Sequence, residues 1–199
     1  MAGYMNEQQL RLAVIIGSVR EGRGGTVVSD WFADEARKFG QFDVDVIDLA
    51  DYELPLSFNK GGPADRRTDI RPLAQALDES DAFAVVTPEY NHSYPAAVKN
   101  AIDWHLGEWQ AKPVGFVSYG GISGGLRAVE HLRPVFSEVH ATTIRETVSF
   151  PNYWEQFDSE GHWPKESEGC GTAAKTLLRQ LAWWARALKD AKAEHPYPG

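Results

Sequence analysis

The chain has 199 residues, of which 43% are hydrophobic and 24% charged, and it carries a formal net charge of −8 at pH 7. This length and composition are typical of one globular domain with a sizeable core. The acidic balance argues against nonspecific binding to nucleic acid or to an anionic membrane, and the single cysteine, Cys170, excludes an intrachain disulfide.

Short apolar runs alternate with segments of helical spacing along the whole chain. In chain order the patterns predict a strand at 12–17, a helix at 26–39, an edge strand at 42–49, a helix at 70–77, a strand at 82–87, a helix beginning at 95, a strand at 113–118, a helix at 125–136, a strand at 142–148 and a helix at 172–193. Pro95 is expected as first residue of the third helix, whose apolar face includes Leu106.

Two segments do not fit this alternation. Residues 51–69 are rich in glycine, proline and charge, which predicts a surface loop. Residues 149–168 form an irregular segment with five aromatic side chains, more than a plain linker needs. Its rings either contribute to a functional surface or simply cover one end of the core, and the sequence leaves both interpretations open.

Five strands joined by helices predict a single α/β domain over 1–199, with a mostly parallel sheet covered on both faces. In such sheets, ligands bind at the carboxyl ends of the strands, where the strand order reverses. The loops that follow the strands at 12–17, 82–87 and 113–118 are therefore the candidate binding loops.

The first loop, SVREGRGGT, begins at Ser18 and leads into the first helix. It has neither the lysine of a P-loop nor the spacing of GxGxxG. Its glycines, its arginines and the free amides at the helix start are nevertheless suited to a phosphate. The alternative is a helix-capping turn with solvated arginines.

The second loop, TPEYNHSYPAAVKNAIDW, offers tyrosine rings and the amide of Asn91 to a heterocycle. The third, SYGGISGGLR, has four glycines that permit close backbone approach to a planar ligand. A flat ring between these two loops, with its phosphate at the first, accounts for all three. Taken alone, the second loop is also compatible with a turn capped by Asn91 or Ser93.

Over residues 12–148 the sequence resembles the NADPH-dependent FMN reductase family of flavodoxin-like proteins, which includes quinone, chromate and azo-dye reductases. The matching stretches are GSVREGRGGTVVSDW, TPEYNHSYPAAVKNAIDW and SYGGISGGLRAVEHLR. The resemblance implies a three-layer sandwich of sheet order 2-1-3-4-5, with FMN at the switch point between the first and third strands.

The resemblance also implies which positions bind the cofactor. The FMN phosphate is expected at Ser18, Arg20, Gly25, Thr26 and Val27; the isoalloxazine ring at Pro88, Glu89, Tyr90 and Asn91 on one side and at Ser118, Gly120 and Gly121 on the other. Arg23 is expected to contact either FMN or the phosphate of NADPH. His92 occupies a variable position and is assigned no catalytic proton.

The leading hypothesis is an oxidoreductase in which NADPH or NADH reduces bound FMN, which then reduces a quinone, a free flavin or a similar small-molecule acceptor by a ping-pong, two-electron route. The alternatives are a flavodoxin-like electron carrier without a nicotinamide site and a redox-responsive interaction protein. The histidine spacings indicate no metal site.

Location and assembly follow from weaker features. The N-terminal stretch lacks the apolar core of a signal peptide, and no run approaches the roughly 20 residues of a membrane span, so a cytoplasmic protein is expected. The helix carrying Lys99, Asn100, Asp103, Trp104 and His105 has more aromatic and charged character than a sheet-covering face requires. Because family members associate through this region, a homodimer or homotetramer is expected.

Overall fold

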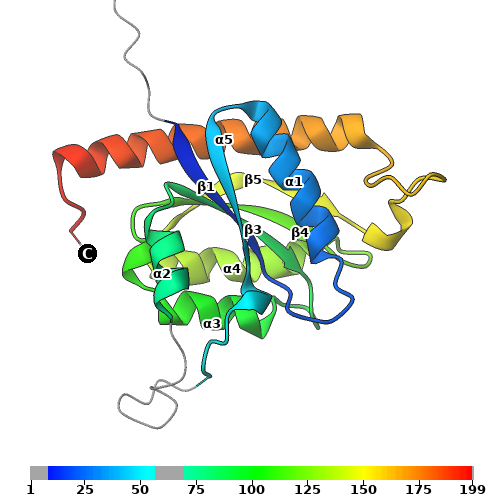
Figure 1. Cartoon of the computed structure of the whole chain (residues 1–199), viewed down its shortest axis with the longest axis horizontal. Helices are drawn as coiled ribbons and strands as arrows, with labels where there is room; N and C mark the ends of the chain where they lie inside the picture. The colour runs from blue at the N-terminus through cyan, green and yellow to red at the C-terminus, as the bar shows by residue number, and fades with distance from the viewer. Residues whose placement is uncertain (1–8, 57–69, 199) are drawn as a thin grey trace, which may run out of the picture.

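The structure, a computed structural model, describes residues 9–56 and 70–198 as a three-layer α/β sandwich (Figure 1). Its single sheet is parallel and has the order β2-β1-β3-β4-β5, which confirms the predicted topology. The strands are β1 (Leu10–Ile16), β2 (Phe42–Asp48), β3 (Ala82–Pro88), β4 (Pro113–Tyr119) and β5 (Thr142–Phe150). The run at 42–48 is an edge strand, as its aspartates predict.

Helices cover both faces of the sheet. The helices α1 (Gly25–Phe39) and α5 (Ser167–Glu194) pack on one face, and α2 (Arg71–Asp78), α3 (Ala96–Trp104) and α4 (Leu126–Glu138) pack on the other (Figure 1). Each face has its own apolar core. The central strands β3 and β4 are buried along their whole lengths, which accounts for their uninterrupted apolar sequences.

The third helix is shorter than predicted. It spans Ala96–Trp104, and Pro95 precedes it as an extended N-cap residue with φ −63° and ψ 143° rather than as the first helical residue. Leu106 lies beyond the helix and is 54% exposed, so the prediction that it lies on the apolar face of the helix is wrong. His105 ends the helix in an extended conformation.

The irregular segment is also shorter than predicted. Ser149 and Phe150 extend β5, and the last helix begins at Ser167 instead of residue 172. The structure describes residues 51–56 of the loop predicted at 51–69, with Asp51 in the short 3-10 helix η1 (Leu49–Asp51); residues 57–69 lie outside the described residues.

The end of β1 lies close to the end of β3. The Gly17 amide donates to the Val86 carbonyl at 2.9 Å, and a Cβ at Gly17 would lie 2.6 Å from Cγ2 of Val98 on α3. Glycine is therefore required where the chain leaves β1. This close approach brings the first candidate loop beside the second, at the switch point of the sheet.

Among the described residues, no helix combines the length and the apolar character that crossing a membrane requires.

Candidate functional site

The three candidate loops meet at the carboxyl edge of the sheet and enclose a cavity of about 300 Å³. A fourth segment, which follows β5, completes the wall. The lining residues are Ser18, Arg20, Glu21, Gly22, Arg23 and Gly24 from the first loop, Pro88, Glu89 and Tyr90 from the second, Tyr119, Gly120 and Gly121 from the third, and Tyr153 and Trp154 from the segment after β5.

Most of the predicted site residues line this cavity, namely Ser18, Arg20, Arg23, Pro88, Glu89, Tyr90, Gly120 and Gly121. Gly25 and Ser118 are buried behind the wall, whereas Thr26, Val27 and Asn91 are not lining residues. Asn91 and His92 have positive φ of 49° and 73° in a tight turn closed by two backbone hydrogen bonds between Tyr90 and Ser93. Asn91 thus shapes the turn, and its side chain is exposed.

Two glycines at the start of α1 make room for two tyrosines. A Cβ at Gly24 would lie 2.2 Å from the Tyr153 ring, and one at Gly25 would lie 2.9 Å from the Tyr119 hydroxyl. No side chain caps this helix, and its first turn has no acidic residue. Its first amides, which follow the cavity-lining Gly24, are therefore not capped by a side chain, and free amides with the positive end of the helix dipole favour an anion.

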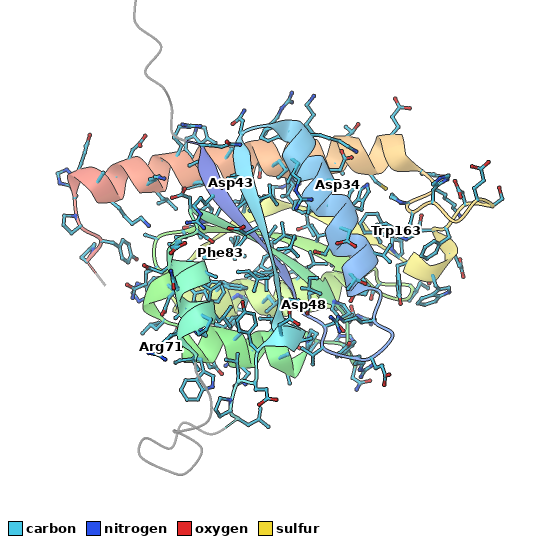
Figure 2. The ribbon with its side chains drawn as sticks, in the orientation of Figure 1. Asp34, Asp43, Asp48, Arg71, Phe83 and Trp163 are labelled. Carbon is cyan, nitrogen blue, oxygen red and sulfur yellow. The ribbon has the colours of Figure 1, made fainter. Side chains whose placement is uncertain are left out.

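Aromatic and cationic side chains form the mouth of the first loop. The Arg20 guanidinium lies 3.7 Å from the centroid of the Tyr90 ring, and the Tyr90 and Ser18 hydroxyls are 2.5 Å apart. Arg23 forms an ion pair with Asp48 at the end of β2, and both side chains are mostly buried. Asp48 is labelled in Figure 2. Arg23 is thereby fixed at the wall, while Arg20 is exposed.

Glu89 lies in the cavity wall and joins the second loop to the third. Its carboxylate, 6% exposed, accepts a hydrogen bond from the Ser123 hydroxyl at 2.7 Å and pairs with the guanidinium of Arg127. Burial alone would raise the pKa of Glu89, but the bonds from Arg127 and Ser123 outweigh it and hold that pKa below its usual value. Glu89 therefore fixes the spacing of two loops; its predicted contact with the ring stays a prediction.

The segment after β5 has both of the roles that its sequence left open. Trp163 packs against Trp31 and Phe150, with ring centroids 5.9 Å and 4.5 Å away, and closes one end of the core (Figure 2). Tyr153 instead donates its backbone amide to Gly120 at 3.2 Å and reaches the cavity together with Trp154. The excess of aromatics at 149–168 left a functional role for Tyr153 and Trp154 open, whereas sequence reasoning did not include Tyr119 among the site residues.

The polar groups at the cavity fit a phosphorylated flavin. The Tyr119 hydroxyl and Nε of Arg23 are buried in the wall and, among the described residues, have no hydrogen-bond partner of good geometry. Buried donors of this kind are destabilising unless a ligand or water satisfies them. With the free amides of α1 they form a donor set suited to a phosphate, and Gly120 and Gly121 leave the backbone of the third loop open to a flat ring.

A comparison with protein families decides the assignment. Residues 10–155 match the model of the NADPH-dependent FMN reductases. The chain belongs to the NADPH-dependent FMN reductase family. The match includes the three loops together with Tyr153 and Trp154 of the cavity wall.

Individual members of this family resemble the chain over part of its length. It is 35% identical to an NAD(P)H-dependent FMN reductase of Schizosaccharomyces pombe, over 58% of this chain and 60% of that protein. It is 29% identical to a quinone reductase of Escherichia coli, over 70% of this chain and 76% of that protein. The aligned part spans less than two thirds of the yeast protein and of a similar FMN reductase from Nectria, of which it spans 63%.

Solved structures share the fold at lower identity. The flavoenzyme FerB, an NAD(P)H:acceptor oxidoreductase from Paracoccus denitrificans, superposes with a TM-score of 0.68 at 23% identity, over 89% of this chain and 98% of FerB. An archaeal flavodoxin superposes with a TM-score of 0.58 at 15% identity, over 89% of this chain and 99% of the flavodoxin. The flavodoxin-like fold expected from the sequence is thus confirmed.

Proposed function

We propose that this family member is an FMN-dependent oxidoreductase that uses NADPH or NADH to reduce a quinone, a free flavin or a similar small acceptor. The observation that carries the proposal is the cavity at the switch point, where an uncapped helix start and unpartnered buried donors adjoin two glycine-flanked loops. Similarity to reductases of both FMN and quinones supports the same reaction class.

Different residues of the chain would bind the phosphate and the ring of the cofactor. Ser18, Arg23 and the α1 amides are placed to hold the phosphate, and Tyr90, Gly120 and Gly121 to hold the ring. When bound, FMN supplies the hydride-accepting and electron-donating chemistry. The protein then needs only to bind and orient the ring.

The two arginines are proposed to act on different molecules. Arg23 is fixed by Asp48 at the wall, which favours a contact with FMN. Arg20 is exposed at the mouth, where its guanidinium can move from the Tyr90 face to the phosphate of an incoming NADPH. Loss of Arg20 should therefore raise KM for NADPH more than for NADH.

Anaerobic mixing tests the reaction class. The FMN-loaded protein is mixed with excess NADPH or NADH while flavin absorbance is recorded, and quinone is added afterwards. Bleaching by either nucleotide, followed by recovery of the band on quinone addition, supports the proposed two-step route. A flavin absorbance band that neither nucleotide bleaches contradicts the proposed route and favours the electron-carrier alternative. Flavodoxins share this fold.

Assembly as a homodimer or homotetramer, predicted from the helix that carries Lys99, Asn100, Asp103, Trp104 and His105, is also supported by exposed apolar side chains near the cavity. Ile122 and Trp154, which flank the mouth, are 90% and 54% exposed, and Leu126 nearby is 49% exposed. A second copy of the chain would remove these side chains from water. Light scattering at micromolar concentration checks this, and a mass near 22.1 kDa, that of one chain, contradicts it. A cytoplasmic location is proposed as well, and fractionation of the source cells tests it.

A further inference from the structure

Tyr119 is the last residue of β4, and its side chain is held rigidly in the cavity wall. It is 3% exposed, and its ring packs edge-on against Tyr153 with centroids 5.0 Å apart. The close approach at Gly25 places its hydroxyl oxygen against the first turn of α1. The oxygen therefore lies at the helix start, where the free amides converge.

The Tyr119 hydroxyl is buried near the Ser18 hydroxyl, but within the described part of the chain it makes no hydrogen bond of good geometry. An unsatisfied buried polar group is destabilising, so a ligand that accepts a hydrogen bond from this hydroxyl would be stabilised by it. Phenylalanine has the same ring and would fill the same space. Burial raises the pKa of Tyr119, so its hydroxyl stays protonated and can only act as a donor or a neutral acceptor.

We propose that the Tyr119 hydroxyl donates a hydrogen bond to the phosphate of FMN and thereby makes the site select FMN over riboflavin. The inference rests on the proposed function, because it needs FMN as the ligand. It also assigns a purpose to Gly25: any side chain there would displace the hydroxyl from the helix start. The phosphate would be held jointly by the amides of α1 and by a donor from the far side of the sheet's switch point.

The test compares dissociation constants for FMN and riboflavin in the wild type and in Tyr119→Phe, measured by quenching of flavin fluorescence. Riboflavin has the same ring but lacks the phosphate. A hydrogen bond to a charged group contributes about 1.5–3 kcal/mol, so FMN binding should weaken by about 10-fold or more, while riboflavin binding stays within about 2-fold.

The stability of the flavin-free protein supplies a second readout. Removing an unpartnered hydroxyl should leave Tyr119→Phe at least as resistant to urea as the wild type, whereas FMN should stabilise it less. Ser29→Ala is the matched control, because the Ser29 hydroxyl is also buried and unpartnered but does not line the cavity. This control should bind both flavins as the wild type does.

Three outcomes overturn the inference. If Tyr119→Phe binds both flavins as the wild type does, the hydroxyl does not contact the phosphate. If both flavins bind more weakly by the same factor, Tyr119 acts only through packing. A clear loss of flavin-free stability shows that the hydroxyl already has a structural partner. A wild type that binds neither flavin contradicts the proposed function itself, and so distinguishes that failure from an error about Tyr119.

Discussion

At the scale of single residues, Glu89 shows how a buried charge can join two loops of a cavity wall. Its carboxylate ties the second loop to Ser123 and Arg127 beside the third. Glu89→Gln keeps the shape but loses the charge, so the loops should separate and both FMN and riboflavin should bind several-fold more weakly. Glu130→Gln, in an exposed pair with Arg133 on the same helix as Arg127, is the control and should bind flavin normally.

The same substitution changes the dependence of stability on pH. Because the pKa of Glu89 is lowered in the folded state, the unfolded chain takes up its proton first as the pH falls. The stabilisation is therefore complete above the unfolded pKa of about 4.3 and disappears as the pH falls through the folded value. Urea unfolding between pH 6 and 3 should show a shallower acid loss in Glu89→Gln; parallel curves would contradict this.

Lys112 also makes stability rise with pH, but in an alkaline window. Its side chain, 6% exposed, donates to the Leu77 and Asp78 carbonyls at the end of α2, each at 2.8 Å, and burial lowers the pKa of Lys112 to about 8. The unfolded chain then binds one more proton between that value and 10.5, so wild-type stability should rise with pH across this window. Relative to Lys112→Met the rise should be about 2 kcal/mol between pH 7.5 and 10, measured by urea unfolding.

The sequence identified site residues that belong to a recognisable loop motif. It could not reveal roles that depend on residues far away in the chain. Ser18, Tyr90 and Gly120 sit in recognisable loop patterns, and the structure places them at the cavity. Glu89 sits in such a pattern too, but its partners lie more than 30 residues away, so its role could not be inferred from neighbours. Tyr119 ends a buried strand, and only the fold brings its hydroxyl to α1.

At the scale of elements, the start of α1 depends on the segment after β5. Gly24→Ala would drive a Cβ into the Tyr153 ring and should destabilise the fold by about 1–3 kcal/mol. Tyr153→Ala removes the obstacle, so the two changes should be strongly non-additive in a double-mutant cycle measured by urea unfolding. Gly169→Ala, where a Cβ meets nothing within 4 Å, is the control and should be additive with Tyr153→Ala.

Hydrophobic periodicity predicted where the helices and strands lie, but it did not predict where several of them begin and end. The buried strands β3 and β4 are continuous apolar runs, which fix their type and place. The helix at α3 ended early because His105 adopts an extended conformation while its ring bonds to the Ala101 carbonyl at 2.8 Å. The early start of α5 at Ser167 has no apolar signal, since its first turns contain glycines and exposed polar residues.

At the scale of the whole molecule, the cavity joins segments that are far apart in the chain. Its wall combines the loops after β1, β3 and β4 with the segment after β5, so a ligand bound there contacts parts that must all be folded. FMN at about 100 times its dissociation constant should add about 2.7 kcal/mol to the free energy of unfolding. For a chain of this size that corresponds to a rise in Tm of roughly 5–10 °C.

Differential scanning fluorimetry of the flavin-free protein measures this rise. The whole transition should move as one step, because the loops of the site are continuous with the strands of a single sheet. Riboflavin at the same multiple of its own dissociation constant should give the same shift, since the linkage depends on saturation and not on chemistry. A shift confined to a minor early transition would show instead that the binding loops unfold separately from the sheet.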